Sequence, residues 1–176
     1  MTPITATLQI EATSDWIWAL FTHFAKYAEW NRLVPRIEGE PQLNGRLRLA
    51  LAPASRRPVA LRARVLVAAR NRELRWHARS RLPKLLRVEH SFRVEQRAGN
   101  CRLHHGLSID GWLASERLIA GLRDSFEATN AALLARAGAI ALVVPSPAIA
   151  VAAPPALLPD AARQRVATTG GVIANP

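Results

Sequence analysis

The longest run of alternating apolar and polar residues extends from Leu86 to Leu113. Its apolar positions are Leu86, Val88, His90, Phe92 and Val94 before the Ala98-Gly99-Asn100 turn, and Cys101, Leu103, His105, Leu107 and Ile109 after it. Alternation with a period of two predicts two antiparallel strands with one buried face, joined as a hairpin. His90 and His105 are the polar residues on the buried side, and we expect them nearly opposite each other, or diagonal if the register slips by one pair.

The same alternation predicts further strands at residues 4–10, 46–52, 59–68 and 73–80. In the strand at 59–68, the inward positions are Leu61, Ala63, Val65 and Val67. A short helix is expected over residues 15–23, with Trp16, Leu20 and Phe24 on its packed side, and a second short helix should end near residues 30–31. Six or seven consecutive strands joined by short turns predict an antiparallel meander.

The periodicity changes after residue 114. Apolar or small residues recur at i, i+3 and i+4 spacing, which predicts one amphipathic helix over about residues 115–136; they are Leu118, Ile119, Leu122, Phe126, Thr129 and Leu133. A helix of about 22 residues is roughly 33 Å long, enough to cross a whole sheet. Residues 138–176 are rich in Ala, Val and Pro without either period, so we expect a domain at 1–137 followed by a weakly ordered tail.

Two segments resemble the START-like or SRPBCC superfamily, in its polyketide cyclase/dehydrase and lipid-transport branch. They are IEATSDWIWALFTHFAKYAEWNRLVPRIEG at residues 10–39 and HSFRV at residues 90–94. His23 and Arg32 depart from the Asp and Pro usual there. The resemblance covers residues 1–137 and implies an α+β helix-grip fold. In that fold, a curved antiparallel sheet of about seven strands wraps around one long C-terminal helix, and two short helices follow the first strand.

The resemblance also implies an apolar cavity between the sheet and the long helix. The residues expected to line it are Trp30, Trp76, Val88, His90, Phe92, Cys101, His105, Leu107, Ile109, Leu118, Leu122, Phe126 and Thr129. A mostly apolar wall with a few polar groups suits a small hydrophobic ligand such as a lipid, an isoprenoid or a polyketide-like aromatic. Alternatively, the chain is a cyclase/dehydratase-type enzyme in which His90 or His105 is a general acid-base. The third interpretation is that both histidines are neutral core residues.

Other classes of site find little support in the sequence. A single cysteine, Cys101, excludes an internal disulfide and cysteine-cluster zinc sites. Two inward histidines without an inward carboxylate are too few ligands for a metal, and no Gly-rich phosphate loop is present, so we expect neither metal nor cofactor. The N-terminus has no secretory pattern, and prolines interrupt the 17 uncharged residues at 137–153. We therefore expect a cytoplasmic protein without a transmembrane span.

The formal net charge of +11 is concentrated in the predicted sheet. Residues 46–102 contain 16 Lys and Arg against 3 acids, a balance of +13. The outward arginines are Arg46, Arg48, Arg62, Arg64, Arg75, Arg79, Arg87, Arg93 and Arg102. They indicate either a solvated sheet face or an adaptor surface for nucleic acid, an anionic membrane or an acidic partner.

Overall fold

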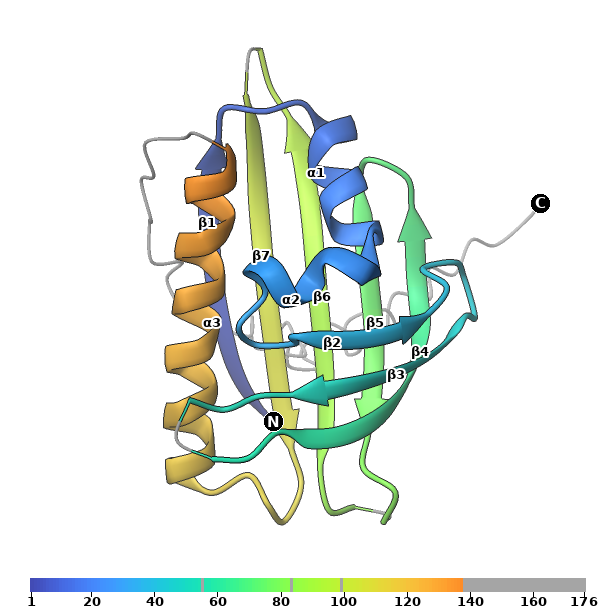
Figure 1. The fold of residues 1–176 in the computed structure, drawn as a ribbon, viewed down its shortest axis with the longest axis vertical. Coiled ribbons are helices and arrows are strands. Elements are labelled where there is room, and N and C mark those ends of the chain that lie inside the picture. The colour runs from blue at the N-terminus through green and yellow to red at the C-terminus, as the bar shows by residue number, and fades with distance from the viewer. Residues whose placement is uncertain (55, 83, 99, 138–176) are drawn as a thin grey trace, which may run out of the picture.

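Seven strands form one antiparallel sheet in the order β1-β7-β6-β5-β4-β3-β2 (Figure 1). The strands are β1 (Thr2–Ile10), β2 (Arg36–Gly39), β3 (Arg46–Leu51), β4 (Val59–Ala69), β5 (Glu73–Arg79), β6 (Arg87–Gln96) and β7 (Cys101–Asp110). This computed structural model describes residues 1–54, 56–82, 84–98 and 100–137. The predicted tail at 138–176 lies outside the described residues.

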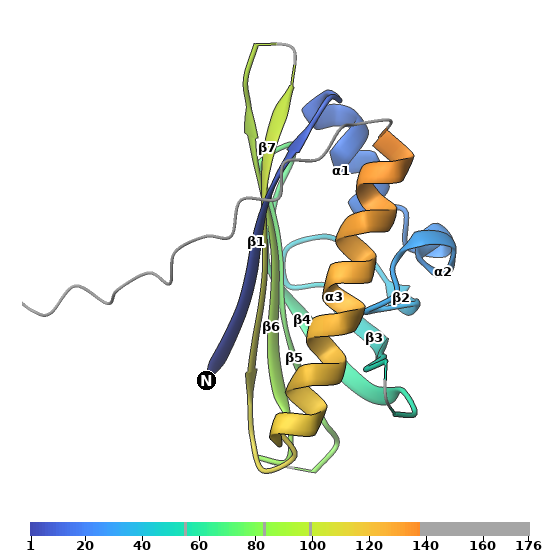
Figure 2. The same ribbon diagram turned by 90° about the vertical axis from the view of Figure 1, so that its left-hand side faces the viewer.

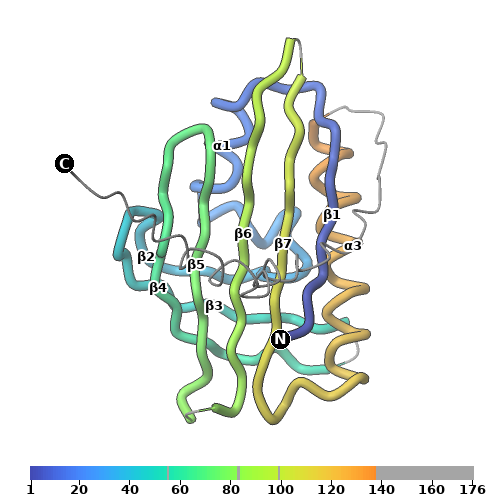
Figure 3. The backbone as a smooth tube through the Cα atoms, turned by 180° about the vertical axis from the view of Figure 1, so that it is seen from behind, coloured from blue at the N-terminus to red at the C-terminus, as the bar shows by residue number. Residues whose placement is uncertain are grey.

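The helices all lie over one face of the sheet, which we call the inner face (Figure 2). They are α1 (Ser14–Thr22), the single 3₁₀ turn η1 (Phe24–Lys26), α2 (Tyr27–Trp30) and α3 (Glu116–Ala137). β2 and β3 curl round toward α3, whereas the opposite, outer face of the sheet carries none of these helices (Figure 3). The predicted helix-grip fold is therefore confirmed, with the long C-terminal helix held against a curved meander.

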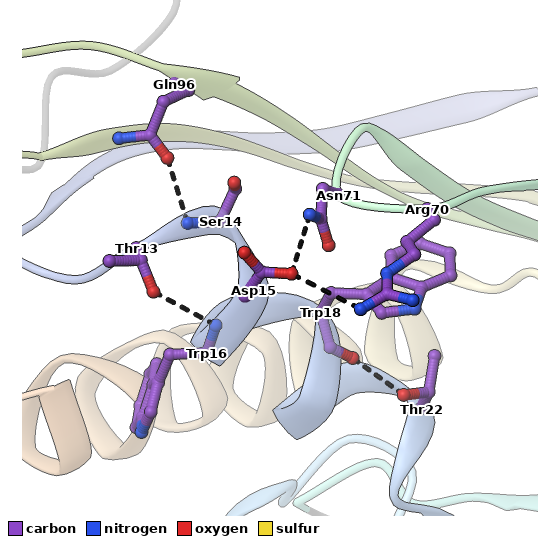
Figure 4. Close-up of polar contacts among 9 residues, drawn as sticks. All are labelled: Thr13, Ser14, Asp15, Trp16, Trp18, Thr22, Arg70, Asn71 and Gln96. Atoms are coloured by element: carbon purple, nitrogen blue, oxygen red, sulfur yellow. Dashed lines mark hydrogen bonds and ion pairs between the residues drawn. The ribbon is translucent and has the colours of Figure 1, made fainter.

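Polar contacts fix α1 at one end of the sheet (Figure 4). The Thr13 side chain caps the helix by accepting from a backbone N–H of the first turn at 3.3 Å. Asp15 accepts a hydrogen bond from Asn71 Nδ2 at 2.8 Å and lies 3.5 Å from the Arg70 guanidinium. The Ser14 backbone N–H donates to the Gln96 side chain at the end of β6 at 2.9 Å. These contacts join α1 to the β4–β5 turn and to β6, and so set which side of the helix faces the sheet.

The packed side of α1 differs from the prediction. Ile17 and Phe21 are the buried residues, whereas Trp16 is 38% exposed and Leu20 is only partly buried. Phe24, in η1, is buried as expected. The apolar residues of α1 point in most directions around the helix, so its periodicity does not select a buried face. The contacts at its N-terminus select that face instead.

Two features of the sheet were not predicted. The four-residue strand β2 pairs with β3, and only Ile37 within it is buried. In β4, a β-bulge interrupts the pairing with β5 between Val65 and Val67. Val67 therefore pairs with the outward Arg75, and Ala68 takes the inward position that the unbroken alternation assigned to Val67.

The placement of α3 depends on two backbone constraints. The chain leaves β7 through Gly111, whose φ of +120° favours glycine and where a Cβ would lie 2.6 Å from the Leu85 carbonyl oxygen. Farther along the helix, the Ala54 N–H in the β3–β4 connection donates to the Gly121 carbonyl oxygen at 2.9 Å. The first constraint fixes where α3 begins, and the second holds the helix against the β3–β4 connection.

Candidate functional site

A pair of directly bonded histidines lies in the centre of the inner face. His90 on β6 and His105 on β7 are 1% and 2% exposed, and their Nε2 atoms are 2.7 Å apart. In the β6–β7 register, His90 faces Leu107, and His105 faces Phe92. The histidines are therefore diagonal neighbours, one pair away from the directly opposite arrangement, and their side chains still meet.

The hydrogen-bond chain continues to the long helix. His105 Nδ1 lies 2.6 Å from the Asn130 side-chain oxygen on α3. Because that oxygen only accepts, the proton of neutral His105 resides on Nδ1, which leaves Nε2 as an acceptor. His90 then donates from its own Nε2, and its Nδ1 carries a lone pair. Each imidazole thus donates toward Asn130, and His90 Nδ1 at the other end of the chain is unprotonated.

Burial keeps both imidazoles neutral. Loss of solvation lowers the pKa of His105 to about 4, even though the hydrogen bond from its ring to Asn130 acts in the opposite direction. Burial also lowers the pKa of His90 well below its usual 6.5, and repulsion from His105 adds to the effect. At neutral pH the pair therefore accepts and donates hydrogen bonds without carrying charge.

Aromatic rings surround the histidine pair. The His105 ring stacks on Phe126 at a centroid distance of 4.1 Å and on Phe92 at 4.6 Å. Trp76 meets the His90 ring edge-on at 4.8 Å. Phe21 of α1 stacks on Phe92 at 4.2 Å, so the short helix completes the aromatic wall. This setting favours flat, apolar groups with a polar atom at one position.

A second polar group lies beside the first, since Thr129 precedes Asn130 in α3. Thr129 Oγ1 accepts from the Leu33 N–H at 2.9 Å and donates to a carbonyl oxygen of its own helix at 2.8 Å. The Asn31 side-chain oxygen accepts from the Val34 N–H at 2.7 Å. These bonds fix the segment after α2 against α3 and bring Asn31 into the buried region.

Three buried polar atoms of this region have no hydrogen-bond partner among the described residues: His90 Nδ1, Trp30 Nε1 and Asn31 Nδ2. His90 Nδ1 is an acceptor, because the proton of this ring is on Nε2. The Trp30 and Asn31 nitrogens are donors. A buried polar atom left unpaired costs about 1–3 kcal/mol. Each of the three atoms is therefore available to a further hydrogen-bonding partner.

The residues predicted to line a cavity are brought together. All of them are buried, and the apolar ones belong to a single core cluster. His90, His105 and Thr129 are buried polar members of the same region. That these residues enclose a ligand cavity stays a prediction. Two hollows of the described chain open on the outer face instead, over β3 and β4.

Sequence reasoning missed three residues of the site, Phe21, Asn31 and Asn130. Asn130 had a usable signal, because it lies four residues after Phe126 and therefore on the same buried stripe of α3. A buried amide on an apolar stripe requires a hydrogen-bond partner, and His105 was already predicted to face the same interior. Phe21 and Asn31 had no comparable signal, since their positions depend on how α1 and α2 are attached.

Among residues 1–137, apart from 55, 83 and 99, no three His, Cys, Asp or Glu side chains lie close enough to hold a metal ion. Within that part of the chain, no helix is both long and apolar enough to cross a membrane.

The meander gripped by a long C-terminal helix is the START-like fold, and solved structures share it. A START superfamily protein from Mycobacterium smegmatis is 17% identical with a TM-score of 0.62, covering 77% of this chain and 97% of that one. The ZhuI aromatase/cyclase from Streptomyces sp. R1128 is 15% identical with a TM-score of 0.63 and coverages of 78% and 93%. A hypothetical protein from Helicobacter pylori is 12% identical with a TM-score of 0.65 and coverages of 77% and 88%.

The family itself is identified by sequence. The family described as polyketide cyclase / dehydrase and lipid transport matches residues 1–138. The chain therefore belongs to this family. No curated protein matches the chain with significant similarity.

Proposed function

We propose that this protein binds a small, largely apolar molecule between the sheet and α3, and that His90 Nδ1 accepts a hydrogen bond from a hydroxyl group of that molecule. The observation that carries this proposal is the directed chain from Asn130 through His105 to His90, which ends on an unpaired acceptor. A polyketide-like aromatic or a hydroxylated isoprenoid has the required combination of apolar surface and oxygen. Membership of a cyclase and lipid-transport family agrees with this class of ligand.

The energetics favour a polar but uncharged ligand. Both imidazoles are neutral because burial disfavours the charged form, and the aromatic rings around them leave no counter-charge for an anion. Trp30 Nε1 and Asn31 Nδ2 are donors suited to a carbonyl or ether oxygen elsewhere on the same molecule. Binding would satisfy up to three polar atoms that are unpaired in the free protein.

A matched pair of ligands tests this proposal. 2-Naphthol and naphthalene have nearly the same shape and differ in one hydroxyl group. We expect the protein to bind 2-naphthol about three- to tenfold more tightly, since one net hydrogen bond contributes about 0.5–1.5 kcal/mol. The preference should disappear in His90→Phe and persist in the control His104→Phe, whose ring is on the outer side of β7. Equal affinities for both compounds in the wild-type protein would refute the assigned acceptor.

Gentle purification followed by native mass spectrometry tests the ligand class independently. The proposal predicts an apolar, oxygen-containing molecule carried by the wild-type protein. Bulky substitutions at Ala78 and Leu107, both on the inner face, should prevent it from binding. Unchanged binding in both variants would mean that the ligand is held elsewhere.

A cyclase/dehydratase activity is the second candidate, and the direct imidazole–imidazole bond favours it. An unprotonated His90 Nδ1 can accept a proton from an acidic C–H or O–H, while its Nε2–H stays hydrogen-bonded to His105. Activity on an added poly-β-ketone thioester should be lost in His90→Ala and in His105→Ala. Because burial lowers both pKa values, the rate should hold from neutral pH to well below pH 6.5 before it falls. Wild-type turnover in both variants would exclude these histidines as the catalytic base.

A further inference from the structure

Two rows of basic residues cross the outer face of β3, β4 and β5. In the first row, Arg62 on β4 is directly opposite Arg48 on β3 and Arg79 on β5. In the second, Arg64 is directly opposite Arg46 and His77. Directly opposite residues have Cβ atoms about 4.5–5.5 Å apart, and like charges at that distance destabilise a sheet. The fold alone therefore gives no reason to place these residues together.

Acidic residues lie beside these rows, but they pair with other arginines. Glu38 on β2 is directly opposite Arg48, yet its carboxylate is 2.8 Å from the Arg36 guanidinium. Elsewhere on the outer face, Arg75 is 3.1 Å from Glu73 and 3.4 Å from Glu89, so it is neutralised locally. Within the part of the chain that the structure describes, no ion pair involves the five arginines of the two rows. The side chains of these five arginines are exposed, so their positive charges are available to an anionic partner.

The two rows also form a hollow. Arg46, Arg48, Arg62, Arg64, His77 and Arg79, which we call the arginine groove, line a depression of about 810 Å³. Arg48 and Arg62 also line a second depression of about 570 Å³, whose floor includes Ala50 and Ala60. The two depressions are thus adjacent along β3 and β4. From residue 46 to residue 50 the arginine groove and the second depression together extend about 13 Å at the usual rise of a strand.

We propose that the arginine groove binds the phosphate backbone of duplex nucleic acid. Guanidinium groups bind phosphate oxygens through two parallel hydrogen bonds, and duplex DNA presents a negative charge about every 1.7 Å along its axis. A groove of this length therefore faces several phosphates at once. The formal net charge of +11 and the sequence pI of about 11.6 also favour approach to a polyanion.

The side chains in the groove favour this partner over other anionic surfaces. The groove contains no Phe, Tyr or Trp on which unpaired bases could stack, as single-strand binders require. Its apolar members are Leu47, which is 2% exposed, and Ala63, so it presents no large side chain to insert into a bilayer. Recognition by charge alone, without sequence preference, fits the backbone of a duplex best.

Salt-dependent binding of the full chain to a fluorescein-labelled duplex tests the proposal. With five arginines engaged, the logarithm of the binding constant should fall against the logarithm of the salt concentration with a slope of about −4.5. Arg48→Gln/Arg62→Gln should bring the slope about two units nearer zero and weaken binding. The control, Arg117→Gln/Arg123→Gln, removes the same charge from the exposed side of α3 and should keep the wild-type slope.

A folding measurement keeps the test interpretable. Removing two opposed charges should raise the melting temperature of the groove variant, so weaker binding could not be ascribed to unfolding. An equal loss of binding in the groove and control variants would overturn the proposal, because net charge alone would then explain the binding. So would the absence of duplex binding at the lowest salt concentration, or binding only to phosphatidylserine vesicles or to inorganic triphosphate.

Discussion

The two faces of the β6–β7 hairpin accommodate basic side chains in opposite ways. On the inner face, His90 and His105 are buried, neutral and bonded to each other and to Asn130. On the outer face, His104 and Arg97 remain partly exposed and contact Glu95 at 3.1 and 3.4 Å. The same alternation therefore produces an uncharged, buried polar network on one side and solvated contacts with a carboxylate on the other. Polar residues that a fold buries at a cost are better candidates for function than those that water already solvates.

The largest difference in stability is expected between substitutions of two adjacent residues of β6, one facing inward and one facing outward. Phe92 is 1% exposed and contacts both histidines, so Phe92→Ala should lower the free energy of unfolding by about 3–5 kcal/mol. Arg93 points outward, and Arg93→Ala should change it by less than about 0.5 kcal/mol. Chemical denaturation of both variants measures the difference. Similar losses would mean that the inner face is not the packed side.

Acid should destabilise the protein through the inner face. Unfolded His105 has a pKa near 6.5, and the folded value is about 4, so the unfolded state binds more protons between these values. The stability conferred by this histidine is complete above pH 6.5 and falls as the pH decreases, by roughly 2 kcal/mol at pH 5. The upper part of this window, between about pH 5 and 6.5, lies above the ordinary pKa values of carboxylates. Denaturation of wild-type protein and His105→Phe across it should show a smaller dependence on pH in the variant, and identical slopes would contradict the lowered pKa.

Substitutions of Asn130 should change the stability of the neutral histidine network or the protonation of His105. Asn130→Leu leaves the His105 N–H without an acceptor, and we expect a loss of about 1–3 kcal/mol. Asn130→Asp retains an acceptor but adds a buried negative charge, which should raise the pKa of His105 by stabilising the imidazolium. Denaturation measures the first effect and NMR titration of the imidazole the second. An unaltered pKa in Asn130→Asp would show that the bond between Asn130 and His105 does not exist in solution.

The smallest changes in the free energy of unfolding are expected on the outer face. They should have opposite signs at Arg62 and Arg75. Arg62→Gln relieves repulsion from Arg48 and Arg79 and should stabilise the fold by about 0.2–1 kcal/mol at low salt. Arg75→Gln removes contacts with two glutamates and should destabilise it by a similar amount. Both differences should shrink in about 1 M salt, where the Debye length falls to about 3 Å. The same sign for both variants at low salt would show that the two arginines have equivalent surroundings.

The sequence was informative wherever one periodicity determined one face. Strict alternation placed His90 and His105 inward, and the 3.6-residue period of α3 placed Phe126 against His105 and Thr129 on the buried side of the helix. The register was less certain, because the length of the turn decides whether the histidines are opposite or diagonal. Their contact follows in both cases, since the side chains are long enough to reach a diagonal neighbour.

The misses share a physical cause, which is dependence on tertiary contacts. α1 is apolar on most sides, so hydrogen bonds to Gln96 and Asn71, rather than its pattern, turn Phe21 inward and leave Trp16 exposed. The bulge that turns Val67 outward is a local insertion that alternation cannot anticipate. Asn130 required knowing which inward side chain it would meet across the core.

The protonation state of His90 tests the central claim most directly. Histidine nitrogen-15 spectra of the free protein at neutral pH distinguish the two tautomers of a neutral imidazole. We predict a proton on His90 Nε2, none on Nδ1, and a change in the Nδ1 signal on adding 2-naphthol but not naphthalene. A proton on Nδ1 of His90, or equal responses to both compounds, would contradict the assignment of this nitrogen as the acceptor for a ligand hydroxyl.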